Sequence, residues 1–149
     1  MYKKILVPLD GSKRAAAILP HVEQMALRYK AGVIFLEVVQ PFLVISGPEA
    51  AYEKLYEKEY QHQQELAENY LTGVEDEFRK KGIETRKHIT QGPVVENIIE
   101  VANKESADLI AIASHGRTGL SRVFYGSVAS GLLHRIDRPL LLIRSRDYS

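Results

Sequence analysis

A stretch near the end of the chain combines glycine, arginine and hydroxyl residues at a spacing that suits anion binding. Gly116 lets backbone amides approach a ligand closely, because no side chain intervenes. Gly126 and Ser127 open a predicted helix, whose unpaired N–H groups and positive dipole end attract an anion. Arg117 and Arg122, between them, would add charge-assisted hydrogen bonds to phosphate oxygens. The spacing indicates a phosphate cradle.

An ordinary strand-to-helix connection explains the same residues equally well, with the glycines forming turns and Ser127 capping the helix. The common phosphate signatures do not decide between the two interpretations. The chain has no GxxxxGK[ST] loop, and no GxGxxG follows its first predicted strand. These absences disfavour a P-loop NTPase and a dinucleotide-dependent dehydrogenase.

Catalytic and metal-binding patterns are weak. His115 has no carboxylate at a recognisable spacing to orient it, so we interpret it as a turn residue and predict no catalytic residue. The other histidines show no paired spacing such as HExxH, and the chain has no cysteine. We therefore expect no transition-metal site. Any Mg²⁺ would arrive with a nucleotide and be held mainly by phosphates and water.

Short apolar runs alternate with longer segments of helical period. This order predicts an α/β protein with a doubly wound, five-stranded parallel sheet in the order 3-2-1-4-5. Pro20 should kink the first helix or mark its first turn. The segment Phe42–Ile45 fits either an apolar flap or interface, or local packing. The predicted strands are 3–9, 33–39, 83–90, 108–113 and 139–144, and the predicted helices are 12–30, 48–81, a segment around 94–102, and 126–136.

Ligands of open α/β sheets bind beyond the carboxyl ends of the strands, where the strand order reverses. With the first strand central, the first and fourth strands flank that crevice, so Asp10 and Gly116 should face each other. The residues expected just after the first four strands are rich in glycine and small polar types: 10–12, 39–41, 91–92 and 114–119.

Composition sets broad limits. The chain has 149 residues, 45% hydrophobic and 26% charged, which fits a single globular domain over 1–149. Its net charge of +1 creates no field that would gather nucleic acid or a membrane surface, so we expect neither partner. The chain shows no signal-peptide core and no apolar run of membrane-spanning length. We expect a cytoplasmic protein.

The whole chain resembles the universal stress protein family, and two regions carry the likeness. They are Lys4–Ser12 (KILVPLDGS), and Ser114–Gly119 (SHGRTG) continuing to Gly126–Ser127. ATP-binding members carry glycine, two residues, glycine, nine residues, glycine, then serine or threonine. Here the pattern reads Ala113, two residues, Gly116, nine residues, Gly126 and Ser127, so three of four positions match. The Ala113 methyl lies where backbone would approach the nucleotide, which puts affinity in doubt but not fold.

The resemblance implies an ATP site, with Mg²⁺ as a possible companion. The Asp10 carboxylate would accept a hydrogen bond from ribose or base, although an Asp before Gly also forms turns. Val38 would offer backbone contacts to adenine. Glu37 stands where relatives often have histidine, and the sequence gives no functional account of it. The remaining residues implied at the site are Pro8 and Leu9 beside adenine and ribose, Ile112 and Val128 lining the pocket, and Ala113, His115, Gly116, Arg117, Gly126 and Ser127 around the phosphates.

Of three possible functions we predict the first and keep the other two as alternatives. The first is a stress-response regulator in which ATP orders the loop 117–125 and changes a surface offered to an unknown protein partner. The second is a slow ATP hydrolase, and the third is a nucleotide-free interaction protein, favoured by Ala113. The short apolar strand 139–144 would leave an uncovered sheet edge, from which we expect a homodimer, as the family resemblance also implies.

Overall fold

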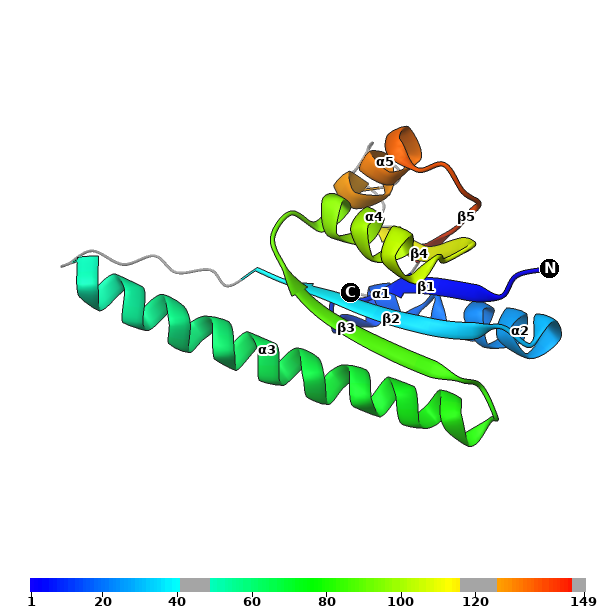
Figure 1. Ribbon diagram of the computed structural model, residues 1–149, viewed down its shortest axis with the longest axis horizontal. Helices are drawn as coiled ribbons and strands as arrows, with labels where there is room; N and C mark the ends of the chain where they lie inside the picture. Colours follow the sequence, from blue (N-terminus) through cyan, green and yellow to red (C-terminus); the bar gives the residue numbers. More distant parts are fainter. Residues whose placement is uncertain (41–48, 116–125, 146–149) are drawn as a thin grey trace.

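The computed structural model describes residues 1–40, 49–115 and 126–145, and only the backbone of residues 49, 50 and 115. Its strands form a parallel sheet in the order β3-β2-β1-β4-β5, with β1 at the centre (Figure 1). Both the α/β class and the strand order predicted from the sequence are confirmed. The strands are β1 Lys4–Pro8, β2 Gly32–Val39, β3 Thr85–Gln91, β4 Leu109–His115 and β5 Leu140–Ser145.

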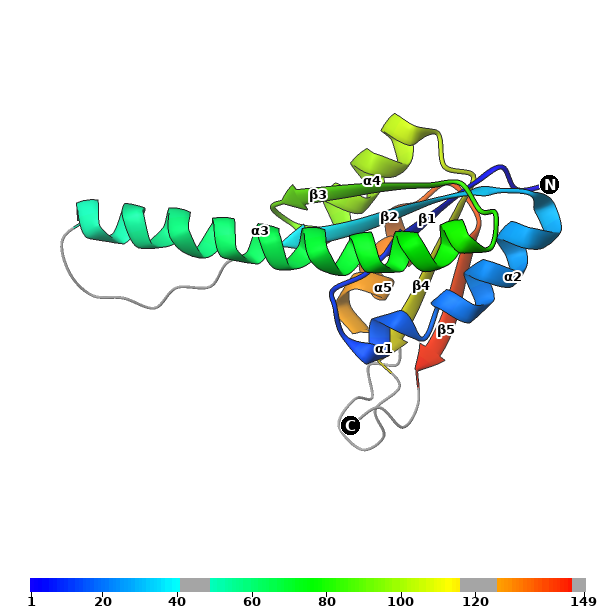
Figure 2. The same ribbon diagram turned by 90° about the horizontal axis from the view of Figure 1, so that it is seen from below.

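Helices cover both faces of this sheet (Figures 1 and 2). On one face lie α1 (Lys13–Ala16), α2 (Leu19–Tyr29) and α3 (Glu49–Lys80), and on the other lie α4 (Val94–Glu105) and α5 (Gly126–Arg135). Because both faces are covered, consecutive side chains of a central strand are all buried. In β1, Ile5 and Val7 join the core under α2 and α3, whereas Leu6 joins the core under α4 and α5. This explains the unbroken apolar runs in the sequence.

The predicted helix 12–30 is two helices, α1 and α2. Ser12 caps α1, since its Oγ accepts a hydrogen bond of 3.1 Å from the backbone N–H of Ala15. A continuous helix would need an N–H from residue 20 to the carbonyl of Ala16, and Pro20 has none. Pro20 instead lies in the first turn of α2, where a missing N–H costs nothing.

Strand bounds also differ from the sequence prediction. The third strand is Thr85–Gln91 rather than 83–90, and the fifth is Leu140–Ser145 rather than 139–144. The fourth extends to His115, because Ser114 pairs with Arg144 and His115 pairs with Ser145 on β5. Ser114 and His115 thus belong to a strand and not, as predicted, to the connection after it.

The helix α3 is longer than the sheet it covers. Ala67, Leu71 and Phe78 are buried in its carboxyl-terminal half. Its amino-terminal half extends past the edge of the sheet (Figure 2) and leaves Tyr52 and Leu55 exposed. The Phe42–Ile45 segment, whose role the sequence left open, lies outside the described residues.

Candidate functional site

A small cleft lies at the carboxyl edge of the sheet, where β1 and β4 end beside the start of α5. Its volume is about 120 Å³, below the range typical of complete small-molecule sites. Residues 116–125, which join β4 to α5, lie outside the described part of the chain. The lining residues are Pro8, Leu9, Asp10, Ala15, Val94, Ile112, Ala113, Ser114, Gly126, Ser127, Val128 and Ala129.

Most of the residues predicted for the site converge on this cleft. Pro8 is the last residue of β1, and Leu9 and Asp10 follow it. The other predicted lining residues are Ile112, Ala113, Gly126, Ser127 and Val128. Val38 lies near the carboxyl end of β2 but does not line the cleft. Gly116, Arg117 and the side chain of His115 fall outside the described residues, so the predicted approach of Asp10 to Gly116 remains a prediction.

Four residues that line the cleft were not predicted as site residues from the sequence: Ala15, Val94, Ser114 and Ala129. Ala15, Val94 and Ala129 lie on helices, and only the packing of those helices decides which face meets the cleft. Ser114 was assigned to a loop, whereas it is buried in β4 and donates from Oγ to the carbonyl oxygen of Ile143 at 3.3 Å. Its position one residue after Ala113 was the available signal.

The carboxylate of Asp10 is held in one orientation. Its Oδ1 accepts a hydrogen bond of 2.9 Å from the backbone N–H of Ser12 and one of 2.6 Å from the Ser12 hydroxyl. The turn-forming role that the sequence left open is therefore real. Both bonds use Oδ1, and the side chain is exposed at the cleft, so a turn role and a ligand contact are compatible.

Gly126 begins α5 with a backbone φ of 71°. An L-residue with a side chain is strained in this left-handed region, by about 1–2 kcal/mol, so glycine is the residue that fits. Ser127 follows as the second residue of α5, which puts it inside the helix. The first turn of α5 thus presents backbone and a hydroxyl side chain to the cleft, as an anion-binding helix start requires.

The charge of Asp10 acts on two further acidic side chains, those of Glu37 and Tyr70. Burial, followed by repulsion from Asp10, raises the pKa of Glu37 to about 7. Burial also raises the pKa of Tyr70, with further contributions from Asp10 and Glu37. Both shifts favour the neutral, protonated form of the side chain over the negatively charged form.

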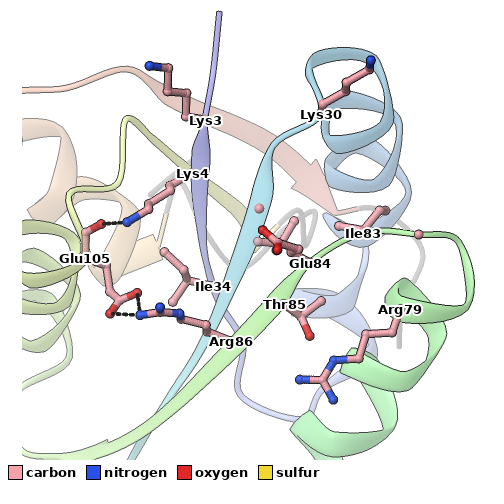
Figure 3. A pocket seen from close by; sticks show the side chains of 13 residues that line it. Lys3, Lys4, Lys30, Ile34, Arg79, Ile83, Glu84, Thr85, Arg86 and Glu105 are labelled. Carbon is pink, nitrogen blue, oxygen red and sulfur yellow. Dashed lines mark hydrogen bonds and ion pairs between the residues drawn. The ribbon is translucent and has the colours of Figure 1, made fainter.

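A larger depression of about 530 Å³ lies at the opposite, amino edge of the sheet (Figure 3). It is lined by basic side chains, including Lys3, Lys30 and Arg79. Lys4 Nζ donates to the carbonyl oxygen of Glu105 at 3.0 Å, and Arg86 contacts both carboxylate oxygens of Glu105 at 3.3 Å. None of the predicted site residues that the structure describes lines this depression.

No group of three or more His, Cys, Asp or Glu side chains in ranges 1–40, 49–115 and 126–145 is arranged to hold a metal ion. Within the same part of the chain, no helix combines the length and apolar character needed to cross a membrane.

The chain is similar to proteins of one family along almost its whole length. The model of the universal stress protein family matches residues 1–144. Universal stress protein MJ0577 of Methanocaldococcus jannaschii is 28% identical over 159 aligned residues, covering 99% of this chain and 98% of that protein. Universal stress protein MJ0531 of the same organism is 30% identical and covers 97% of this chain and 83% of its own length.

Solved structures give the same result for the fold. The structure of MJ0577 superposes with a TM-score of 0.84 at 30% identity, covering 100% of this chain and 99% of that one. A universal stress protein in complex with cAMP has a TM-score of 0.71 at 19% identity, with 97% and 98% coverage. An Archaeoglobus fulgidus universal stress protein in complex with dAMP has a TM-score of 0.64 at 21% identity, with 95% and 98% coverage.

Proposed function

This chain belongs to the universal stress protein family, and we propose that within it the chain binds adenine nucleotide, ATP foremost, at the carboxyl-edge cleft as a regulatory ligand. Two proteins of the same fold were solved in complex with adenine nucleotides, cAMP and dAMP. Their identity to this chain is about 20%, so the support from its own residues carries more weight.

The observation that carries the proposal is the convergence at one cleft of the end of β1, the end of β4 and the start of α5. Asp10 provides a carboxylate oriented by Ser12, suited to accept hydrogen bonds from ribose hydroxyls. Gly126 and Ser127 provide the start of a helix, suited to phosphate. Pro8, Ile112 and Val128 add apolar surface for a base. Mg²⁺ would accompany ATP on its phosphates.

The proposed role is binding rather than catalysis, in a cytoplasmic stress-response protein. Hydrolysis of ATP requires a positioned water and a group that orients it. The carboxylate nearest the cleft, Asp10, has Oδ1 engaged by Ser12, which suits a recognition role better than proton transfer.

The test is to denature the purified protein, identify any released small molecule by mass spectrometry, and titrate stripped protein with Mg-ATP, AMP and cAMP by calorimetry. Stoichiometric adenine nucleotide or saturable binding would support the proposal. The proposal would be refuted if the purified protein released no nucleotide and the titration gave no binding heat at high micromolar nucleotide concentration.

The methyl group of Ala113 favours a second candidate, a nucleotide-free interaction protein. Ala113 is half-buried and lines the cleft, so its Cβ takes space that a glycine would leave open. Absence of binding in the titration above would promote this candidate.

We further propose a homodimer formed through the strand 139–144. β5 lies at one edge of the sheet, and Leu140, Leu141, Leu142 and Ile143 are all only partly buried. An apolar edge strand of this kind tends to pair with another chain. Light scattering at micromolar concentration should give twice the mass of the 16.8 kDa chain, and a monomer would refute the proposal.

A further inference from the structure

We propose that Glu37 is a positioning residue of the nucleotide site: its side chain is a neutral acid that acts through Asp10, so that nucleotide binding is accompanied by proton uptake. The inference rests on the proposed function, since it concerns the same cleft. Glu37 itself does not line the cleft.

The position of Glu37 in β2 directs its side chain under α3. Phe35, two residues earlier on the same face of the strand, packs against Phe78 of α3 with ring centroids 5.1 Å apart. Within the described residues, Glu37 Oε1 and the hydroxyl of Tyr70, on α3, are both buried without a hydrogen-bond partner. A carboxylate oxygen buried without a partner is costly, whereas a protonated carboxyl is far less so. The neutral acid is the form that this environment accepts.

The charges around Glu37 reinforce that state. Asp10 lies two residues after the end of β1, and α3 contributes Tyr70, whose own pKa is raised. β3 contributes Lys87 on the same face, but its Nζ is occupied by Glu68 at 3.0 Å and by Glu75 at 3.2 Å. Burial first and Asp10 second raise the pKa of Glu37 to about 7. The proton is therefore exchanged near neutral pH.

Asp10 connects Glu37 to the cleft. Asp10 lines the cleft, and its Oδ1 is held by a hydrogen bond from Ser12. Its negative charge also raises the pKa of Glu37. A ligand that covers the cleft displaces water which screens the two carboxyls from each other. Repulsion between them then strengthens, because the interaction energy grows as the local dielectric constant falls. Glu37 retains its proton more firmly in the bound state, and binding must draw a proton from solution near pH 7.

The decisive experiment is calorimetric titration with Mg-ATP at pH 6, 7 and 8, each in two buffers of different ionisation enthalpy. Three proteins are compared: the unmodified chain, Glu37→Gln, which is neutral at every pH, and Tyr70→Phe, which loses a hydroxyl but no proton that titrates in this range. The difference between the unmodified chain and Glu37→Gln cancels the titration of the ATP phosphates and of histidines.

Above pH 7, we expect the unmodified chain and Tyr70→Phe to lose nucleotide affinity relative to Glu37→Gln, by up to about tenfold per pH unit. In these two proteins, binding should take up to one proton from solution. Glu37→Gln should retain the affinity that the unmodified chain has at pH 6. Binding at pH 6 with the same pH dependence in all three proteins would overturn the inference and leave the proposed function standing. No binding at any pH would overturn both.

A second measurement needs no variant. The side-chain carboxyl of Glu37 can be followed by ¹³C NMR during a pH titration of the free and the nucleotide-saturated protein. A midpoint near 7 that moves upward with nucleotide supports the inference. A midpoint near 4.5 in the free protein overturns it.

Discussion

The two edges of the sheet carry cavities of opposite character. At the amino edge the cavity is large, about 530 Å³, and two of its cations have partners on Glu105: Arg86 contacts the carboxylate, and Lys4 contacts the backbone carbonyl oxygen. At the carboxyl edge the cleft is only about 120 Å³. Asp10, which lines it, helps to raise the pKa values of Glu37 and Tyr70, and each of these side chains has a buried polar atom without a partner within the described residues. Volume alone would favour the amino edge, whereas the residues that line the smaller cleft favour the carboxyl edge for the proposed nucleotide site.

The direction of the chain explains the contrast. Helices of a parallel sheet run opposite to the strands, so their carboxyl ends gather at the amino edge, where cations complement the negative ends of the helix dipoles. Lys30 follows α2, and Arg79 and Lys80 lie in the last turn of α3. The basic lining of the larger depression thus has a structural explanation. The start of α5 lies instead at the carboxyl edge, where its free N–H groups suit an anion.

The largest expected effect comes from placing the same substitution, glycine to aspartate, at both edges of the sheet. Gly126→Asp puts a side chain at φ 71° and a carboxylate where phosphate is proposed to bind, and we expect a loss of nucleotide affinity of about 100-fold. Gly82→Asp imposes similar strain at φ 83° on the amino edge. Both variants should lose about 1–3 kcal/mol of stability in urea unfolding. Equal loss of nucleotide affinity in the two, by calorimetry, would contradict the contrast.

A second pair neutralises one aspartate at each edge. Asp10→Asn should weaken nucleotide binding about tenfold, because a charged acceptor is replaced by a neutral one. Asp108→Asn should leave nucleotide binding unchanged, since Asp108 accepts from the backbone N–H groups of Lys3 at 2.9 Å and Lys4 at 3.2 Å. It should lower stability by about 1 kcal/mol. The idea fails if Asp108→Asn weakens binding as strongly as Asp10→Asn.

The third prediction concerns pH. The pKa of Glu37 is raised to about 7 in the folded chain, so folding favours its protonated form, and stability should fall between about pH 4.5 and 7 and then level off. Glu37→Gln removes this fall. We expect the variant to be more stable than the unmodified chain by about 1–2 kcal/mol above pH 7. This is less than the roughly 3 kcal/mol of the full shift, because the half-buried carboxyl is screened by water. Urea unfolding that showed a pH-independent difference would argue against it.

The smallest expected effect tests the methyl group of Ala113. Ala113→Gly should tighten nucleotide binding by up to about threefold, since the backbone is uncovered, while costing about 0.5–1 kcal/mol of stability for a glycine within a strand. Ala111→Gly, fully buried on the same face of β4 and outside the cleft lining, is the matched control. It should cost stability without tightening binding. An unchanged affinity in Ala113→Gly would show that the methyl is harmless.

The fold could be predicted because consecutive apolar residues, as in Ile5–Val7, and helical periods were both unambiguous. The missing N–H of Pro20 predicted a kink or a first turn there, and the structure has the first turn of α2, but the division of 12–30 into two helices was not predicted. The end of β4 could not be predicted, because Ser114 and His115 are polar and only pairing with β5 keeps them in the strand. The candidate site was predicted from glycine and aspartate at strand ends. Its helical contributors, such as Val94, depend on packing that no local pattern contains.

Glu37 is the clearest case of information that only the fold supplies. In the sequence it is one acid in an apolar strand, without a functional account. Its raised pKa comes from burial in the fold and from the charge of Asp10, which follows the neighbouring strand β1, and its own charge acts on Tyr70, 33 positions later in the chain.

The two halves of α3 are packed against the core to different extents, so we expect them to differ in local unfolding. With 32 residues it spans about 48 Å, and only its carboxyl-terminal half is anchored in the core (Figure 1). Isolated helical segments are marginal in water, so its backbone amides should exchange with deuterium in a gradient, fast near Tyr52 and slow near Leu71. The two halves of one continuous helix would then unfold locally at different rates. A partner that bound the amino-terminal turns would slow amide exchange there.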